Sequence, residues 1–417
     1  MFKKRITPFT CIFITILACI ITFVAVTSFR SVEEKADTNE NRLDSAEYGQ
    51  YKEFLELVGK DIDKHAKIEQ LLAMVEGSYI RDFDTDLLWE NMYKALVLSI
   101  GDAYSQYLTV EEYEELASSG NGNFVGIGVH GSYDVDSMGI YIFGVIPDSP
   151  AEQAGLQSGD IVINVEGIEA NGENYYEMLD AVRGKAGTKV NLTIIRDGER
   201  VEYWITRNNV TSENVLYEKL ADNIAYVRIL SFADSSVSEE FIEKLIRAAS
   251  DGCDKFIFDV RNNSGGYLDE IIDVLDCLLP EGPIINIVYA DDSVKTHNSD
   301  ANRIIEGEMV VLCNENTASA AELFTAALRD YDIADIVGTT TFGKGTMQTT
   351  RLLSDGSALK LSTAFYNPPS NVSYDLIGIT PDYIVEPDEE WLDRFFKMPK
   401  EKDTQLQKAI ELLGSTK

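Results

Sequence analysis

Three short segments in the C-terminal half contain residues that could form and break an acyl bond. In the first, CNENTASAAE (313–322), Ser319 stands among small residues where a helix is expected to begin. The free N–H groups and the positive dipole end of a helix N-terminus favour a nucleophile whose reaction builds an oxyanion. The N–H of Ala320 could donate to that oxyanion. The alternative is that Ser319 only caps the helix.

The second segment, TFGKGTMQ (341–348), places Lys344 between Gly343 and Gly345. A lysine acts as a general base only when it is neutral, so its pKa must fall from about 10.4 toward about 7–8. Glycines allow close backbone approach and could draw this side chain inward. The alternative is a solvated lysine in a turn.

The third segment, FDVRNNSGGY (258–267), reads as a buried strand that ends in a glycine-rich turn. Gly265 or Gly266 could turn a backbone N–H toward a reacting carbonyl oxygen. An ordinary strand-to-helix turn is the alternative.

The elements around these segments indicate an α/β domain, because strand and helix patterns alternate over residues 208–385. MQTTRLL and SALKLSTAFY flank Asp355-Gly356, which predicts a hairpin turn. Residues 124–207 are rich in short β patterns, and residues 47–117 read as largely helical.

The N-terminus predicts the compartment. Lys3, Lys4 and Arg5 precede residues 6–29, which carry no charge and would form a helix about 36 Å long, enough to cross a bilayer. The basic flank should stay inside. We therefore expect a single-pass cell-membrane protein whose catalytic part is extracytoplasmic. A cleaved signal peptide is the alternative.

Composition excludes several classes of protein. The net charge of −34 argues against binding nucleic acid, which needs clustered Lys and Arg. Of the 3 histidines, only His297 lies in the α/β region, and there is no GxSxG motif, so a Ser–His–Asp hydrolase is disfavoured.

Taken together and in this order, FDVRNNSGG, TASAAE and FGKGTMQ resemble the carboxy-terminal processing peptidases, also called tail-specific proteases. VGIGV with PAEQAGLQSGDIVINVEG resembles that family's PDZ domain, and GDAYSQYLTVEEYEEL the segment before it. The resemblance implies an α/β protease core with an inserted β-rich PDZ domain, an N-terminal helical segment and, with the apolar segment above, one N-terminal transmembrane helix. The expected parts are a cytoplasmic stub and anchor (1–30), a linker (31–46), a helical N-terminal region (47–120), a PDZ-like domain (121–207), a Ser–Lys peptidase core (208–387) and a C-terminal helical segment (388–417).

The resemblance also assigns roles to residues. It makes Ser319 the nucleophile, Lys344 the general base and Gln348 the residue that helps hold the lysine. Gly265 and the N–H of Ala320 would form the oxyanion hole, with Gly266 as the alternative to Gly265. The family often has a second serine where Ala321 stands. GDAYS also replaces the more usual DPxS, a change that we expect to touch no catalytic position.

A PDZ-like groove takes an extended peptide as an added strand. The loop that would capture the terminal carboxylate contains Val125, Gly126, Ile127 and Gly128, while Ile127 and Val129 would line the pocket for an apolar last residue. Arg183, at the end of YYEMLDAVRG, is a candidate for coupling tail binding to activity; a solvated helix-end arginine is the alternative.

These interpretations predict a serine endopeptidase that cleaves extracytoplasmic proteins near accessible apolar C-terminal tails, with no metal or organic cofactor. The rival function is a catalytically idle scaffold that binds tails through the PDZ-like domain. A homodimer through the helical segments 50–117 and 388–417 is a further expectation for partners.

Overall fold

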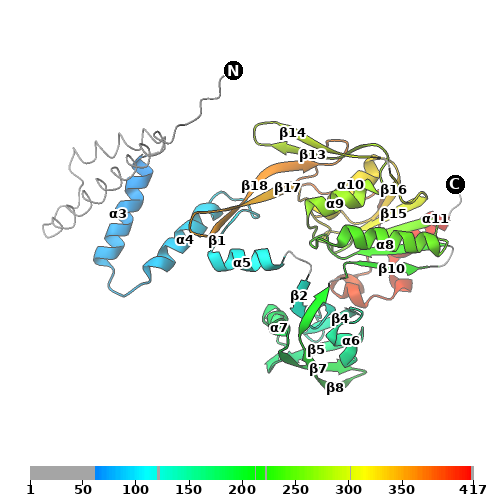
Figure 1. Cartoon of the computed structure of the whole chain (residues 1–417), viewed down its shortest axis with the longest axis horizontal. Helices are drawn as coiled ribbons and strands as arrows, with labels where there is room; N and C mark the ends of the chain where they lie inside the picture. The colour runs from blue at the N-terminus through cyan, green and yellow to red at the C-terminus, as the bar shows by residue number, and fades with distance from the viewer. Residues whose placement is uncertain (1–61, 120–122, 212, 221–222, 301, 415–417) are drawn as a thin grey trace, which may run out of the picture. The chain divides into compact units, whose positions relative to one another are not determined.

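The computed structural model describes residues 62–119, 123–211, 213–220, 223–300 and 302–414 (Figure 1). Internal contacts divide the chain into two units, Met1–Thr85 and Asp86–Lys417. The predicted transmembrane segment (6–29) and linker (31–46) lie outside the described residues. Among the helices that the structure does describe, none is long and apolar enough to cross a membrane.

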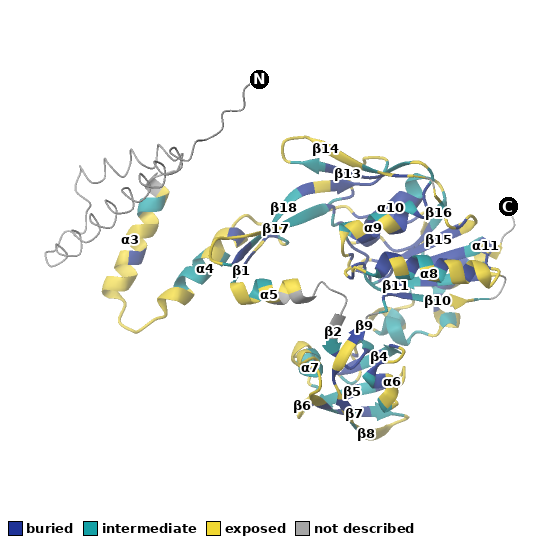
Figure 2. Ribbon diagram, in the orientation of Figure 1, coloured by how far each residue is buried: buried dark blue, intermediate teal, exposed yellow. Residues whose placement is uncertain are grey.

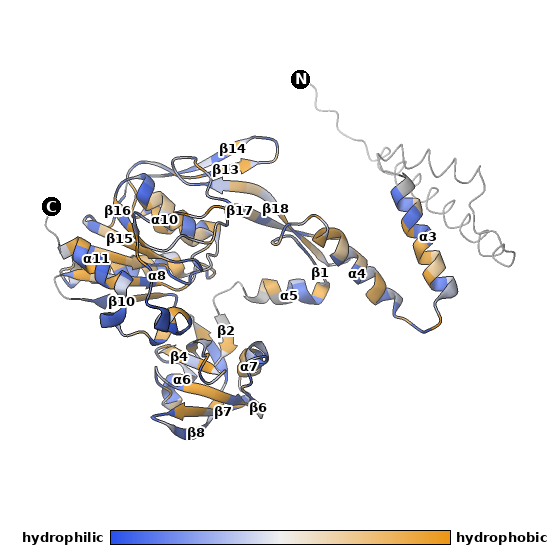
Figure 3. Cartoon of the chain, turned by 180° about the vertical axis from the view of Figure 1, so that it is seen from behind, coloured by the Kyte–Doolittle hydropathy of each residue, from blue (hydrophilic) through white to orange (hydrophobic). Residues whose placement is uncertain are grey.

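The described N-terminal region is largely helical, with α3 (Ile62–Ser78), α4 (Thr85–Leu98) and α5 (Val110–Ser119). Figure 3 shows α4 as mainly hydrophobic, yet much of it is exposed in Figure 2; Leu96 and Leu98 are 70% and 75% exposed. A strand that the helical interpretation did not include, β1 (Gln106–Leu108), lies between α4 and α5. It pairs antiparallel with β18 (Ala358–Asn367), which joins β1 to the C-terminal half of the chain.

Residues 123–211 form a β-rich domain. Its sheet has the order β3-β4-β5-β7-β8, with β6 paired to β5. The elements are β3 (Val129–Tyr133), β4 (Ile140–Val145), α6 (Pro150–Ala154), β5 (Ile161–Val165), β6 (Ile168–Glu169), α7 (Tyr175–Val182), β7 (Lys189–Arg196) and β8 (Glu199–Thr206). Alternate side chains of β7, namely Val190, Leu192 and Ile194, are fully buried, as expected for a strand with one face on a core.

Two features of this domain bear on peptide binding. The chain enters and leaves it along the antiparallel pair β2 (Asn123–Gly126) and β9 (Asn208–Thr211). Strand β3 is at the edge of the main sheet, where its only strand partner in the described chain is β4. An edge strand of this kind leaves backbone groups available to an added strand.

The C-terminal half is built on a second sheet, with the order β10-β11-β12-β15-β16-β19. Its strands are β10 (Val215–Lys219), β11 (Ile224–Ile229), β12 (Lys255–Asp259), β15 (Glu308–Cys313), β16 (Ala334–Gly338) and β19 (Tyr383–Ile384). All neighbouring pairs are parallel except β10–β11. This confirms the α/β core that the alternating strand and helix patterns predict.

Helices cover both faces of this sheet. On one face lie α8 (Val237–Ser250), α9 (Leu268–Asp276) and α10 (Ala320–Asp330), whose apolar residues pack with Phe256 and Phe258 of β12. On the other face, α11 (Thr404–Gly414) packs against Ile257. Because successive side chains of a strand point to opposite faces, the run Phe-Ile-Phe serves both cores.

A third sheet follows the loop that contains Lys344. Its order is β1-β18-β13-β14, with β17 paired to β18. The remaining strands are β13 (Gly282–Tyr289), β14 (Val294–Ser299) and β17 (Thr346–Leu352). The predicted hairpin is confirmed, since β17 and β18 pair up to Leu352 opposite Ala358, on either side of Asp355-Gly356.

The C-terminal segment begins with the 3-10 turns η1 (Glu389–Lys397) and η2 (Lys400–Lys402), before α11. The ring of Phe396 stacks on that of Phe143 in β4, with centroids 4.0 Å apart. Lys397 forms an ion pair with the buried Asp134. The segment thus contacts both the β-rich domain and the core sheet.

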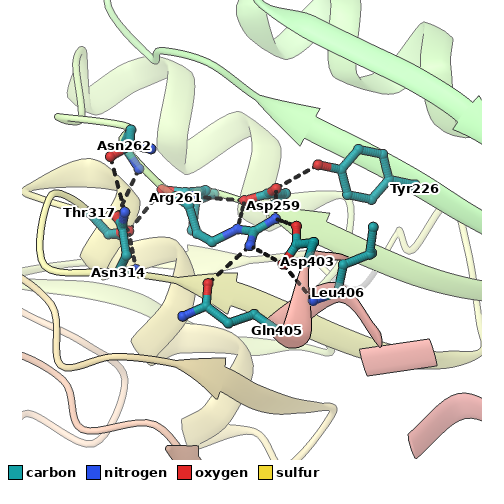
Figure 4. A network of polar contacts seen from close by, with 10 residues as sticks. Tyr226, Asp259, Arg261, Asn262, Asn314, Thr317, Asp403, Gln405 and Leu406 are labelled. Atoms are coloured by element: carbon teal, nitrogen blue, oxygen red, sulfur yellow. Dashed lines mark hydrogen bonds and ion pairs between the residues drawn. The ribbon is translucent and has the colours of Figure 1, made fainter. Parts of the chain in front are cut away.

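A buried ionic network joins α11 to strand β12 (Figure 4). The guanidinium of Arg261 lies 2.7 Å from Asp259 and 2.8 Å from Asp403, and the Tyr226 hydroxyl donates to Asp259 at 2.6 Å. Burial opposes ionisation of Asp259, but the charges of Arg261 and Arg228 outweigh it and lower the Asp259 pKa to about 2. Arg261 directly precedes the glycine-rich turn, so the network fixes the start of that turn.

Arg261→Met should destabilise the protein by about 3–5 kcal/mol, because it removes the guanidinium that pairs with both Asp259 and Asp403. The measurement is urea unfolding monitored by circular dichroism. The matched control is Arg394→Met, which removes an exposed ion pair with Asp136 and should leave the unfolding midpoint near wild type. Equal midpoints for the two variants would contradict a stabilising role for the buried network.

Candidate active site

Ser319 occupies a tight turn between β15 and α10. Its φ of 58° and ψ of −122° lie outside the regions that a serine normally adopts. The turn is held by tertiary hydrogen bonds: Thr317 Oγ1 donates to the carbonyl of Val260, and the N–H of Ala318 donates to the carbonyl of Asn263, both at 2.9 Å. Such a backbone persists only when its surroundings determine it, and it is common at active sites.

The glycine-rich turn lies directly against Ser319. Gly265 has a φ of +96°, and a β-carbon there would come within 2.6 Å of Ser319 Cβ and 2.8 Å of the Ala320 nitrogen. No other residue type fits this position. The three predicted residues Ser319, Ala320 and Gly265 are therefore brought together.

The two glycines differ in the state of their N–H groups. The N–H of Gly265 donates to Asn263 Oδ1 at 2.8 Å. Among the described residues, no hydrogen bond engages the N–H of Gly266. Ala320 is the first residue of α10, so its N–H has no partner within the helix. The choice between Gly265 and Gly266 for the oxyanion hole therefore stays open.

Lys344 lies in the loop between β16 and β17, and its side chain is half-buried. The loop is compact because Gly343, with a φ of +91°, packs so closely that a β-carbon would lie 2.9 Å from the Gly378 nitrogen. Burial lowers the pKa of Lys344, and Lys360 lowers it further, while Asp102 and Glu322 act in the opposite direction. A lowered pKa is what a lysine base requires.

Ser319 and Lys344 are linked through the Tyr366 hydroxyl. In the described chain no hydrogen bond joins their side chains; instead, Lys344 Nζ lies 4.5 Å from the centre of the Tyr104 ring. The Tyr366 hydroxyl lies 2.9 Å from Ser319 Oγ and 2.8 Å from the Lys344 carbonyl oxygen. Catalytic contacts are often long in the absence of substrate, so this arrangement is compatible with a Ser–Lys pair.

Glu322 connects the turn that contains Ser319 to the loop that contains Lys344. Its fully buried carboxylate accepts from the N–H groups of Ser319 at 2.9 Å and Lys344 at 2.8 Å through Oε2. Through Oε1 it accepts from Thr341 Oγ1 at 2.6 Å and the Gly343 N–H at 2.7 Å. The sequence interpretation assigned Glu322 no role, although an acidic residue three positions after a helix-start serine is a capping-box signal.

Gln348 is near the lysine loop but does not contact the lysine ammonium. Its amide donates to Ser362 Oγ at 3.0 Å and to the Thr346 carbonyl at 3.2 Å. A register shift in β17 between Met347 and Gln348 accompanies this orientation. Its assignment as the holder of Lys344 stays a prediction.

One expectation about the segment before the β-rich domain is wrong. GDAYS was expected to touch no catalytic position, but the Tyr104 ring covers Nζ of Lys344, the predicted general base. The N–H of Ser362 donates to Ser105 Oγ at 3.1 Å, across 257 residues of sequence. No local spacing signals a contact of this range; the pairing of β1 with β18 creates it.

The predicted peptide-binding residues run from the end of β2 to the start of β3. Val125 and Gly126 end β2, and Val129 begins β3 at the sheet edge. Ile127 is only 1% exposed and packs in the domain core, so it does not line an open pocket in this state. Its carbonyl accepts from the N–H of Ala151, and Gly128 has a φ of +86°.

Arg183 lies at the C-terminus of α7. Its side chain is exposed, and a guanidinium nitrogen is 3.9 Å from the Asp180 carboxylate. This environment matches the alternative of a helix-end arginine. Its proposed regulatory role stays a prediction.

Residues 223–385 match peptidase family S41, and residues 141–196 match the PDZ domain. The chain belongs to peptidase family S41. The S41 match contains Ser319, Lys344, Gln348 and Gly265, and the PDZ match lies within the β-rich domain.

Individual proteases are also similar to this chain. A probable CtpA-like serine protease of Staphylococcus saprophyticus is 33% identical over 78% of this chain and 66% of that protein, and one of Staphylococcus haemolyticus is 35% identical over 76% and 64%. The match thus spans slightly less than two thirds of those relatives. Among solved structures, the photosystem II D1 C-terminal processing protease is 26% identical with a TM-score of 0.50, over 86% of this chain and 92% of that one. A putative S41 protease of Bacteroides fragilis, 19% identical with a TM-score of 0.56 over 78% and 90%, shows the same fold.

Proposed function

We propose that this S41 protein is a serine endopeptidase that cleaves proteins near their C-terminal tails, with Ser319 as nucleophile and Lys344 as general base. The observation that carries the proposal is the arrangement of Ser319 in a strained turn at the start of α10, tied through Glu322 to the loop of a half-buried lysine. The lowered pKa of Lys344, caused first by burial, supports its role as a base.

The proposed reaction is acyl transfer. Neutral Lys344 accepts the Ser319 hydroxyl proton as Oγ attacks the scissile carbonyl carbon. The carbonyl oxygen becomes an oxyanion that accepts from the Ala320 N–H and a glycine N–H. The lysine ammonium then protonates the leaving amine as the C–N bond breaks, and an ester remains on Ser319. Water, deprotonated by Lys344, hydrolyses the ester and restores the hydroxyl.

Tail recognition is assigned to the PDZ domain. The free edge of β3 supports addition of an extended peptide, and the residues between β2 and β3 would supply N–H groups for its carboxylate. Since Ile127 is buried in this state, the proposed pocket for an apolar last residue requires a shift of this loop on binding.

Amidating the C-terminus of an unfolded substrate that ends in an apolar residue should slow cleavage about ten- to a hundredfold, because charge-assisted hydrogen bonds to the carboxylate are lost. Mass spectrometry of the products measures the rate and the cleavage site. Equal cleavage of free and amidated tails would remove carboxylate capture from the proposal. Ser319→Ala separates the two candidate functions, since it should bind tails without turnover; a wild-type chain that only binds tails would be a scaffold.

We also propose that residues 6–29 anchor the chain in the cell membrane with the peptidase domain outside. The basic flank before this uncharged segment supports the orientation. Protease added to intact cells should digest the PDZ and S41 domains, and an internal control protein should stay intact. Full protection of both domains would reverse the orientation. Pairing of two copies through segments 50–117 and 388–417 stays a prediction that sedimentation equilibrium can test.

A further inference from the structure

We propose that the turn Asp102–Ser105 is a positioning element of the active site that holds the Lys344 ammonium beside the Tyr104 ring between turnovers. Tyr104 supplies the ring and Asp102 the compensating charge. This inference rests on the proposed function for the meaning of Lys344, but it concerns a segment outside the residues that match the S41 and PDZ descriptions.

The turn is anchored firmly enough to hold a side chain in place. Ser105 is 5% exposed, its hydroxyl donates to Asp102, and it accepts from the N–H of Ser362 at 3.1 Å. The carboxylate of Asp102 also accepts from the N–H of Tyr104 at 3.2 Å. Directly after the turn, Gln106 of β1 is paired with Lys360 of β18.

The same contacts reach the predicted catalytic residues from a second side. Ser362, which donates to Ser105, accepts from the Gln348 amide at 3.0 Å through its hydroxyl. A continuous chain of hydrogen bonds therefore runs from Asp102 through Ser105 and Ser362 to Gln348. Gln348 can thus affect the position of Lys344 by stabilising the turn Asp102–Ser105, which holds the Tyr104 ring against the lysine.

The face of the Tyr104 ring favours the charged form of the lysine. Its centre lies 4.5 Å from Lys344 Nζ, within the range of a cation–π interaction, which attracts an ammonium and not a neutral amine. Loss of the proton would weaken this contact and leave the neutral amine free to accept the proton of Ser319. The contact with Tyr104 thus holds the protonated lysine, which is inactive, and releases the neutral lysine, which can act as a base.

The charged groups around Lys344 come from several elements. Burial and Lys360 of β18 favour the neutral amine, while Asp102 of the turn and Glu322 of α10 favour the ammonium. Asp375, which accepts from the Gly345 N–H, adds a further negative charge near Tyr104. Of the acidic groups acting on Lys344, Glu322 also holds the backbone, so Asp102 is the one that can be neutralised without dismantling the lysine loop.

The test measures the pKa of Lys344 in the full chain carrying Ser319→Ala, by the 13Cε NMR signal that disappears in Lys344→Arg. Asp102→Asn should lower this pKa by about half a unit or more, because it removes a charge that favours the ammonium. Tyr104→Leu should lower it in the same direction, since leucine keeps an apolar cover without a π face. Tyr104→Phe keeps the ring and should retain the wild-type value.

The matched control is Asp355→Asn. Asp355 also accepts from a serine hydroxyl two residues on, but at the far end of the β17–β18 hairpin, so the pKa of Lys344 should not change. The proposal would be overturned if the pKa of Lys344 were unchanged or raised in Asp102→Asn or in Tyr104→Leu. It would also be overturned if Tyr104→Phe lowered the pKa of Lys344 as much as Tyr104→Leu does. Because this titration needs no turnover, its failure is distinguishable from failure of the proposed peptidase activity.

In the active enzyme the rising limb of kcat/KM against pH should move to lower pH in Asp102→Asn. An equal loss of rate at every pH would indicate that the turn has only a structural role.

Discussion

Lys344→Met should reduce peptide hydrolysis at least about a thousandfold while leaving the fold and tail binding intact, because methionine fills a similar volume without a basic nitrogen. Lys344→Arg should be equally inactive, since arginine keeps its proton at any usable pH. The measurement is single-turnover cleavage of a tailed substrate, with fluorescence anisotropy for tail binding. Lys295→Met, at an exposed position of β14, is the matched control and should retain full activity.

The pH dependence of the wild-type enzyme follows from the lowered pKa of Lys344. Burial is the main cause, so the rate should rise with pH through an apparent pKa below the ordinary value of about 10.4. At pH values between the pKa of Lys344 in the folded protein and its higher pKa in the unfolded chain, the unfolded chain binds more protons at this lysine. The contribution of Lys344 to the free energy of unfolding therefore rises with pH in that range. Lys344→Met should therefore not lower the thermal midpoint at neutral pH. If the purified variant kept more than a few per cent of wild-type turnover, Lys344 would not be the base.

Glu322→Gln should lower kcat about a hundredfold with a smaller change in KM. The amide keeps the shape of the carboxylate but has one accepting oxygen, while the N–H groups of Ser319, Gly343 and Lys344 and the hydroxyl of Thr341 all donate to this group. The NH2 group of the glutamine would face hydrogen-bond donors, and the segments that contain Ser319 and Lys344 would shift. A misplacement of about 1 Å can cost about a hundredfold in rate.

The stability of this variant gives a second measurement. Unpaired buried donors should cost about 1–3 kcal/mol in urea unfolding. Glu315→Gln is the control, because Glu315 lies in the turn before α10, is exposed, and in the described chain accepts a hydrogen bond from Thr339 Oγ1 at 2.9 Å. Wild-type kcat in Glu322→Gln would show that the carboxylate does not position the catalytic loops.

The contacts that join the catalytic segments follow from local sequence only in part. Tyr366 lies in SALKLSTAFY, whose pattern predicts a strand but not that one of its hydroxyls reaches Ser319. Tyr104 lies in a segment that reads as helical, yet it precedes β1 and faces Lys344. Both contacts depend on the third sheet, in which β18 is flanked by β1 and β17. Pairing between strands so far apart in sequence leaves no periodic signal in either segment.

The sequence by itself determined the family, the α/β core, the β17–β18 hairpin and the three segments that contain Ser319, Lys344 and Gly265, because each depends on local pattern or on glycines at positions where a side chain would clash. Only the tertiary structure decided that Glu322 holds the serine and lysine loops together, that Gln348 faces Ser362, and that Tyr104 covers Lys344. The physical reason is that hydrogen bonds and ring contacts depend on the register of strands and the direction of side chains to within about an ångström, and these are fixed by packing among elements remote in the chain.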